Sequence, residues 1–205
     1  MKVLLINGSY HEKGCTYTAL SEGAKALNAN GVETEIYWIG QHQVNGCKGC
    51  WACKKLKKCV IDDGVNEFVE KAAEFDGFVF GSPVYYASAA GALVSLMDRA
   101  FYSGKKSFEY KPAAAVVSCR RAGASTTFDV INKYFAINGM PIVGSNYWNE
   151  IHGNTAEEAL QDEEGLQTMR ILGNNMAWLL KCIQLGKEAG LAPEKERKIM
   201  TNFIR

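Results

Sequence analysis

The stretch Val3-Leu-Leu-Ile-Asn-Gly-Ser-Tyr-His-Glu-Lys-Gly-Cys-Thr-Tyr-Thr18 begins as an apolar run, continues as a glycine-bearing polar loop and ends where an amphipathic segment starts. The consecutive apolar residues from Val3 to Ile6 are typical of a strand buried on both faces. The periodicity that follows predicts a helix over about 16–29. A short apolar run followed by a longer amphipathic one recurs along the chain, and this alternation determines the fold that we expect.

Four further apolar runs read as buried strands: Glu35–Ile39, Gly77–Phe80, Ala113–Val117 and Pro141–Val143. Helical patterns follow at about 64–74, 90–103, 124–138 and 156–188. Strands that alternate with helices and are apolar on both faces predict a parallel sheet covered on both sides. We therefore expect a doubly wound α/β fold. No repeat or linker divides the chain, so residues 1–205 should form a single domain with one long irregular segment at about 40–62.

The composition excludes several classes of protein. Hydrophobic residues make up 47% of the 205 residues and charged residues 22%, which is ordinary for a soluble globular protein. The net charge of +1 argues against a dedicated nucleic-acid binder, whose surface would be strongly basic. The first apolar run stops at Asn7, too early for a signal peptide, and no stretch is long enough to span a membrane. We expect a cytoplasmic protein whose thiols are kept reduced.

The loop from Asn7 to Thr18 has the features of an anion site. A glycine-bearing loop that enters a helix presents unpaired backbone N–H groups and the positive end of the helix dipole. Hydroxyls of Ser9, Thr16 and Thr18 would add donors, and His11 or Lys13 would add charge. The loop matches neither the Walker pattern nor the dinucleotide fingerprint. A terminal phosphomonoester fits it better than a pyrophosphate, and the alternative is a plain polar turn with a helix cap.

A second loop, Gly81-Ser-Pro-Val-Tyr-Tyr-Ala-Ser-Ala-Ala-Gly91, follows the third strand and leads into a helix that carries Asp98-Arg99. Its proline fixes the backbone, its small residues permit close approach of a flat ligand, and its tyrosines offer aromatic faces. In doubly wound sheets a ligand binds outside the carboxyl ends of the strands, where the strand order reverses. Both loops lie at that point. A surface turn or a subunit contact is the alternative for either tyrosine alone.

Four cysteines lie in one lysine-rich stretch, Cys47-Lys-Gly-Cys50-Trp-Ala-Cys53-Lys-Lys-Leu-Lys-Lys-Cys59. Two successive C-x2-C steps and a fourth cysteine let thiolates converge on one centre, as in ferredoxin-type cluster runs. Zinc held by all four thiolates, or a loop of free thiols, remain alternatives. The long loop in a compact domain indicates a function. We interpret the isolated Cys119 and Cys182 as buried structural thiols.

These motifs resemble the flavodoxin-like NAD(P)H-dependent FMN reductase family, and in particular its iron–sulfur flavoprotein branch. The resemblance extends over nearly the whole chain and rests on Gly8-Ser9-x-His11-x-x-Gly14-Cys15-Thr16, on Gly81–Tyr86 with Asp98-Arg99, and on the turn Ser118-Cys-Arg-Arg-Ala-Gly123. It implies a five-stranded parallel sheet in the order 2-1-3-4-5 with helices on both faces. It also implies FMN as the cofactor and NAD(P)H as the co-substrate.

The resemblance assigns residues to each part of the flavin. It assigns binding of the FMN phosphate to Ser9, His11, Cys15, Thr16 and Tyr17. It assigns contact with the isoalloxazine ring to Pro83, Val84, Tyr85 and Tyr86. The turn that closes over the other side of the ring contributes Arg120 and Gly123. Cys47, Cys50, Cys53 and Cys59 resemble the compact motif that holds a [4Fe-4S] cluster in the iron–sulfur flavoproteins. Such a cluster beside a flavin would relay single electrons.

Two positions depart from the family pattern. Relatives commonly have Arg at the position of His11 and Asn at the position of Cys15. Because neutral His holds phosphate less firmly than Arg, the departure weakens the expected affinity rather than the assignment. A helix N-terminus can lower the pKa of a cysteine and make it reactive. For Cys15 we favour the simpler interpretation of a small residue that gives access to the backbone.

The resemblance predicts an FMN oxidoreductase that takes a hydride from NAD(P)H and passes electrons to a small molecule or a protein. An electron carrier between a ferredoxin and an acceptor, and a metal-stabilised interaction module, are the alternatives. Trp51, Trp148 and His152 are candidates for the rim of a nicotinamide pocket. We also expect a homodimer or homotetramer, a possible ferredoxin-like redox partner, and no nucleic-acid or membrane partner.

Overall fold

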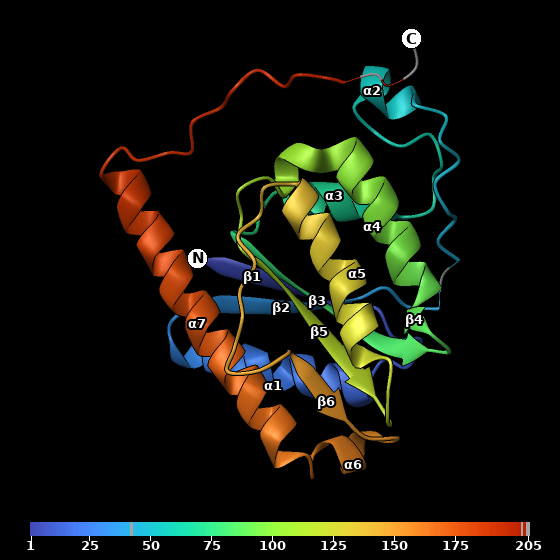
Figure 1. The fold of residues 1–205 in the computed structure, drawn as a ribbon, viewed down its shortest axis with the longest axis vertical. Helices are drawn as coiled ribbons and strands as arrows, with labels where there is room; N and C mark the ends of the chain where they lie inside the picture. The colour runs from blue at the N-terminus through green and yellow to red at the C-terminus, as the bar shows by residue number, and fades with distance from the viewer. Residues whose placement is uncertain (42, 202, 204–205) are drawn as a thin grey trace.

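The computed structural model describes residues 1–41, 43–201 and 203. A parallel sheet in the order β2-β1-β3-β5-β6 forms its centre (Figure 1). Its strands are Lys2–Asn7 (β1), Glu33–Trp38 (β2), Gly77–Tyr85 (β3), Ala113–Cys119 (β5) and Glu150–His152 (β6). The short β4, Ser88–Ala89, pairs antiparallel with the end of β3. The predicted doubly wound fold is confirmed, with β4 as an addition.

Helices cover both faces of the sheet (Figure 1). On one face lie α1 (Cys15–Ala29) and α7 (Glu163–Glu188), and on the other lie α3 (Val65–Ala72), α4 (Gly91–Gly104) and α5 (Ala124–Ile137). Three shorter helices complete the set: α2 (Ala52–Leu56), the 3₁₀ turn η1 (Lys105–Ser107) and α6 (Ala156–Ala159). No helix among the described residues combines the length and apolar character needed to cross a membrane.

The alternation of side chains along each strand explains the two layers. Val3 and Leu5 of β1 pack with α1 and α7, whereas Leu4 and Ile6 belong to the core beneath α3, α4 and α5. Both faces of β1 are therefore buried, as its unbroken apolar run predicts. The central strands hold the loops at their carboxyl ends in fixed positions.

The edge strand lies elsewhere than predicted. Ile142, within the predicted Pro141–Val143, forms only an isolated parallel bridge with Ala113, and the strand is Glu150–His152, which pairs with the end of β5. Between these segments the buried Asn149 donates from Nδ2 to the Ala115 carbonyl at 3.0 Å. An amide side chain thus continues the ladder, and the polar composition of the true strand hides it from a hydrophobicity pattern.

The predicted helix at 156–188 is two helices. The first, α6, ends after Ala159, and Asp162 caps α7 by accepting a hydrogen bond from the N–H of Gly165 at 2.9 Å. The same carboxylate accepts from the N–H of His152 at 2.7 Å. Asp162 therefore ties the start of α7 to the end of β6, a tertiary contact that helical periodicity does not report.

Candidate functional site

A cavity of about 740 Å³ opens at the carboxyl ends of the parallel strands. The lining comes from the loops after β1, β2 and β6, from the carboxyl end of β3, and from the end of β5 with the residue that follows it, and it includes residues 9–16, 83–85, 118–120 and 153–157. This is the position where doubly wound sheets bind ligands. The two loops that the sequence singled out therefore face the same space.

The first loop is held in shape by hydrogen bonds between side chains and its backbone. Asn7, buried at the end of β1, accepts from the N–H of Ser9 at 3.0 Å and donates from Nδ2 to the carbonyl of Glu12 at 2.9 Å. From the second strand, Trp38 donates from Nε1 to the carbonyl of Ser9 at 2.9 Å. Ser9 Oγ in turn accepts from the N–H of His11 at 3.1 Å, which leaves the hydroxyl proton of Ser9 free to donate.

The loop leads into the N-terminus of α1. Gly14 is the cap residue and makes no side-chain capping bond, and no acidic residue lies in the first turn. The N–H groups of Cys15, Thr16 and Tyr17 occupy that turn, where a helix offers them no carbonyl partner. Because the first turn of α1 contains no acidic residue of its own, this helix end is suited to an anion.

Two predicted side chains contribute differently from the expectation. Thr16 is buried, and its Oγ1 lies 2.8 Å from Ser118 Oγ, so that it joins the first loop to the end of β5. Tyr17 is half-buried and its side chain is not among those lining the cavity, which leaves its backbone N–H as its contribution.

The thiol of Cys15 points toward the loop after β6. Its Sγ donates to the carbonyls of Gly153 and Thr155 at 3.4 and 3.2 Å. Burial raises the pKa of the Cys15 thiol, and the neighbouring Glu158 and Glu157 raise it further. A lowered pKa, which the helix N-terminus alone suggested, is therefore wrong here, and the structure agrees with the simpler reading of a small residue beside the backbone.

The second and third loops form the other walls. Pro83, Val84, Tyr85 and Arg120 line the cavity, and Tyr85 reaches the first loop because its hydroxyl accepts from the N–H of Tyr10 at 3.3 Å. Gly123 lies behind Val84: it has a positive φ of 89°, and a Cβ there would meet Val84 Cγ1 at 2.9 Å. It shapes the wall without lining it.

Other predicted residues lie away from this cavity. The side chain of Tyr86 is fully exposed on the β3–β4 turn, and it is absent from the lining together with Trp148 and His152. Trp51 lines a different cavity, that of the cysteines. Cys119 is buried as expected, but Cys182 is exposed on α7, so its interpretation as a buried thiol is wrong.

One wall of the larger cavity was not predicted from the sequence. Residues 153–157 line the cavity after β6. Thr155 Oγ1 accepts from the N–H of Glu158 at 3.2 Å, and Glu158 Oε2 accepts from the N–H of Asn154. The pattern Thr155-Ala-Glu-Glu158 is that of a capping box and could have located this helix start.

The four cysteines lie around a second, smaller cavity of about 170 Å³. Cys47, Cys50, Cys53 and Cys59 all line it, together with apolar groups that include Trp51 and Ile61. The thiols are free and range from exposed to half-buried. Within the described part of the chain, no three His, Cys, Asp or Glu side chains are arranged to hold a metal ion. The segment thus brings the four predicted ligands to one hollow without closing them around a single ion.

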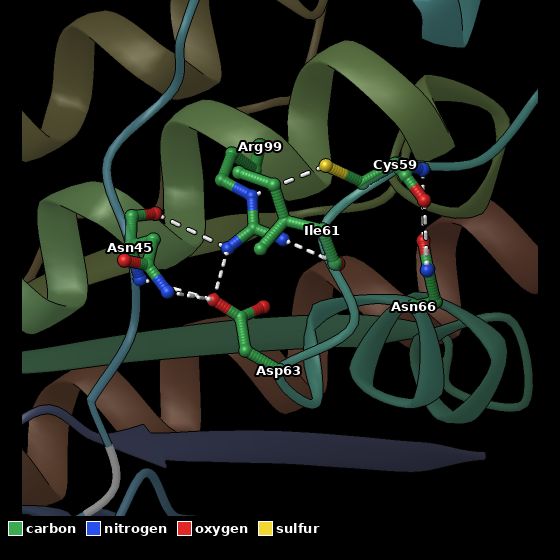
Figure 2. Close-up of polar contacts among 6 residues, drawn as sticks. All are labelled: Asn45, Cys59, Ile61, Asp63, Asn66 and Arg99. Atoms are coloured by element: carbon green, nitrogen blue, oxygen red, sulfur yellow. Dashed lines mark hydrogen bonds and ion pairs between the residues drawn. The ribbon is translucent and has the colours of Figure 1, made fainter.

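The buried Arg99 of α4 connects this segment to the helix layer (Figure 2). Its guanidinium donates to Asp63 Oδ2 at 2.6 Å and to Cys59 Sγ at 3.2 Å. The hydrogen bond from Arg99 holds the pKa of the Asp63 carboxyl at about 2, below its usual range. In the sequence, Arg99 is recognisable only as part of the Asp98-Arg99 motif, because nothing in the pattern shows that its charge is buried.

The two cavities have separate linings. Residues 83–85 of β3 line the larger one, whereas Arg99, Tyr102 and Ser103 in the second half of α4 line the cysteine cavity. Among the described residues, none of Cys47, Cys50, Cys53 and Cys59 lines the larger cavity.

Comparison with known proteins decides the family. Residues 1–155 match the family model of the NADPH-dependent FMN reductases. An iron–sulfur flavoprotein of Methanocaldococcus jannaschii is 35% identical over 193 residues, which cover 90% of this chain and 100% of the relative. The chain belongs to the iron–sulfur flavoprotein branch of this family. The resemblance that its motifs indicated is confirmed.

Other relatives agree with this assignment. An iron–sulfur flavoprotein of Methanosarcina thermophila is 31% identical over 193 residues, covering 92% of this chain and all of that protein. A flavodoxin from the domain Archaea has a TM-score of 0.61 at 15% identity, and the match covers 88% of this chain and 99% of that chain. The archaeal flavodoxin supports the fold alone. Membership of the FMN reductase family makes flavin oxidoreductase chemistry the general function.

Proposed function

We propose that this protein is an FMN-dependent oxidoreductase that takes a hydride from NAD(P)H and passes electrons to a small-molecule or protein acceptor. We further propose that Cys47, Cys50, Cys53 and Cys59 hold a [4Fe-4S] cluster. The observation that carries the proposal is the cavity of about 740 Å³, which joins a helix N-terminus at one end to a proline- and tyrosine-containing wall at the other. When bound, FMN accepts a hydride as an electron pair and can release electrons singly.

The first loop would hold the flavin phosphate. Ser9 keeps its hydroxyl proton for an incoming acceptor because its Oγ already accepts from His11 N–H. The first-turn N–H groups of α1 supply further donors along the helix dipole. The exposed side chains of His11 and Lys13 lie on the same loop and could add positive charge. Anion binding here would depend more on backbone groups than on one fixed cation.

The second and third loops would hold the ring. Pro83 and Val84 give an apolar surface, and Tyr85 is anchored to the first loop through its hydroxyl. Gly123 lies behind this wall, where its lack of a Cβ permits close packing against Val84. Arg120 lines the cavity from the end of β5 and is exposed to incoming ligands. These contacts would orient the ring while leaving one side accessible to the nicotinamide.

The cysteine cavity supports a multi-atom cluster over zinc. A single Zn²⁺ ion requires its sulfur ligands at about 2.3 Å from one point. All four thiols surround one cavity of about 170 Å³, and their two overlapping C-x2-C steps are less typical of zinc than two separated pairs. A four-iron cluster spreads its ligands over a wider volume, and the four cysteines match its required ligand set.

An electron carrier between ferredoxin and an acceptor is the second candidate. It is favoured by the exposed surface around the cysteines, where the ammonium of Lys54 lies 4.0 Å from the centre of the exposed Trp51 ring. A lysine-rich surface with an aromatic group suits an acidic protein partner. Under either candidate we propose a cytoplasmic homodimer or homotetramer without nucleic-acid or membrane partners.

Anaerobic mixing separates the two candidates. Rapid bleaching of the flavin absorbance by NADPH or NADH supports the oxidoreductase, and the faster of the two identifies the preferred donor. Bleaching only by a reduced ferredoxin supports the carrier. Failure of the protein to take up FMN contradicts both.

A further inference from the structure

Arg99 is an unusual residue to find inside a helix layer. Its side chain is only 1% exposed, although burial removes the favourable hydration of a guanidinium. Its Nη1 donates to Asp63 Oδ2 at 2.6 Å and to the Asn45 carbonyl at 3.1 Å, and Nη2 donates to the Ile61 carbonyl at 2.8 Å. The third nitrogen, Nε, donates to Cys59 Sγ at 3.2 Å (Figure 2).

The partners of Arg99 come from both ends of the cysteine segment. Asn45 precedes Cys47, whereas Cys59, Ile61 and Asp63 follow the other three cysteines. One rigid, five-donor group therefore joins the two ends of the segment and fixes both to α4. A guanidinium that only stabilised the fold could bond to backbone carbonyls and a carboxylate alone. Here Arg99 Nε also donates to the sulfur of Cys59.

We propose that Arg99 is a positioning residue for the metal group of the cysteine cavity. It holds Cys59 in place as a ligand, and its charge and N–H···S contact stabilise the reduced form of that group. This inference rests on the proposed cluster. Hydrogen bonds to ligand sulfurs and nearby charge set the reduction potentials of iron–sulfur centres. A positive group that adds no ligand therefore raises the potential by favouring the added electron.

Asn66 provides a matched control on the same cysteine. Its Oδ1 accepts from the N–H of Cys59 at 2.9 Å, and its Nδ2 donates to the carbonyl of Cys59 at 3.0 Å (Figure 2). This neutral side chain positions the backbone of Cys59 and has no hydrogen bond to its sulfur. Loss of Asn66 removes placement without removing charge, whereas loss of Arg99 removes both.

The test compares wild type, R99K, N66A and the double variant D63N/R99Q, each reconstituted anaerobically with iron and sulfide. The double variant avoids a stranded buried carboxylate, and R99K keeps the charge but loses the planar fork. Three quantities are measured: iron and sulfide content per chain, the reduction potential of the bound group by EPR-monitored titration, and FMN affinity. Trypsin cleavage at the lysines of residues 48–58 in the metal-free protein reports the order of the segment.

We expect D63N/R99Q to bind less than half the wild-type iron, to be cleaved faster, and to show a more negative potential in the fraction that is loaded. N66A should also lose iron but keep the wild-type potential, and R99K should retain a potential nearer to wild type than the double variant does. FMN affinity should be unchanged in all three. If the double variant keeps the iron content and the reduction potential of wild type, the role of Arg99 is refuted, while the proposed cluster is not. A wild-type protein that binds no iron overturns the cluster, and this role with it.

Discussion

At the scale of single residues, the acid-sensitive group of the cysteine segment is Asp63. The hydrogen bond from Arg99 lowers its pKa to about 2, and further bonds from Asn45 act in the same direction. Since the folded pKa lies below the unfolded one, the stabilisation is complete above about pH 4 and is lost as the pH falls toward 2. Comparison of urea unfolding of wild type and D63N should show a gap on the order of 2 kcal/mol at pH 7 that narrows over this window.

The control is a comparison of how the unfolding free energies of wild type and D63N change with pH. D63N cannot ionise at that position, so its stability should change less between pH 4 and pH 2.5 than that of wild type. A gap between the two proteins that stays constant with pH would show that Asp63 is not the group that titrates.

Gly8, which opens the first loop, is fixed by packing, whereas Gly91 at the start of α4 is not. A Cβ at Gly8 would lie 2.9 Å from both the Gly81 carbonyl oxygen and Leu93 Cβ, whereas one at Gly91 would meet nothing within 4 Å. We expect G8A to lose about 1–3 kcal/mol of unfolding free energy and to bind FMN more weakly. G91A should stay within about 0.5 kcal/mol of wild type. Equal stabilities of G8A and G91A would refute this close approach.

At the scale of elements, the loop before α1 and the N-terminus of α1 should bind FMN, which carries a phosphate, more tightly than riboflavin, which does not. Ser9 has a free hydroxyl proton at the loop, and hydrogen bonds to charged groups contribute about 1.5–3 kcal/mol. We expect S9A to weaken FMN binding by about 10–100-fold while leaving riboflavin binding nearly unchanged, as measured by fluorescence quenching. Y17F is the control, because the Tyr17 side chain does not line the cavity. Equal losses for FMN and riboflavin would place the phosphate elsewhere.

The elements that the sequence predicts well are those buried on both faces. The apolar runs at β1, β3 and β5 predict strands because burial by helices on both sides requires continuous hydrophobicity. The edge strand Glu150–His152 is short and polar, and the Asn149 side chain replaces part of its ladder. Hydrophobic periodicity cannot detect a three-residue strand in which one apolar residue lies between two polar ones.

The candidate site is predictable to a similar extent. Residues next to strand ends, such as Ser9 and Pro83, follow from the topology because carboxyl ends of parallel strands meet at one edge. Roles set by tertiary contacts do not follow, and Cys15 and Arg99 are the two clear cases. The sulfur of Cys15 is turned toward carbonyls of the loop after β6, and the charge of Arg99 is buried against a segment about 40 residues away.

At the scale of the whole molecule, the described residues after α7, from Leu191 to Thr201, are all exposed. Residues 191–201, which follow α7, form no helix or strand (Figure 1). The apolar side chains of this segment are exposed: Leu191 by 70%, Ile199 by 84% and Met200 by 77%. An exposed ion pair, Lys195 with Glu109 at 3.6 Å, links it to the turn after α4, and such pairs contribute little.

Truncation after Ala189 tests whether this segment serves assembly. We expect the unfolding free energy of the chain to change by less than about 1 kcal/mol at a concentration where the protein is monomeric, since few contacts are lost. The mass measured by light scattering should fall from that of a dimer or tetramer to that of a monomer. K195A, which removes only the ion pair, should keep the assembled mass. An unchanged mass after truncation would assign the interface to another surface.

The visible spectrum of the anaerobically purified protein, with flavin, iron and sulfide analysis on the same sample, tests both cavities at once. We predict flavin bands with about one FMN per chain, a broad additional absorption, and iron and sulfide each near fourfold over the chain. Flavin bands without iron would leave the larger cavity as proposed and refute the cluster. A colourless protein that takes up no added FMN would contradict the proposed function.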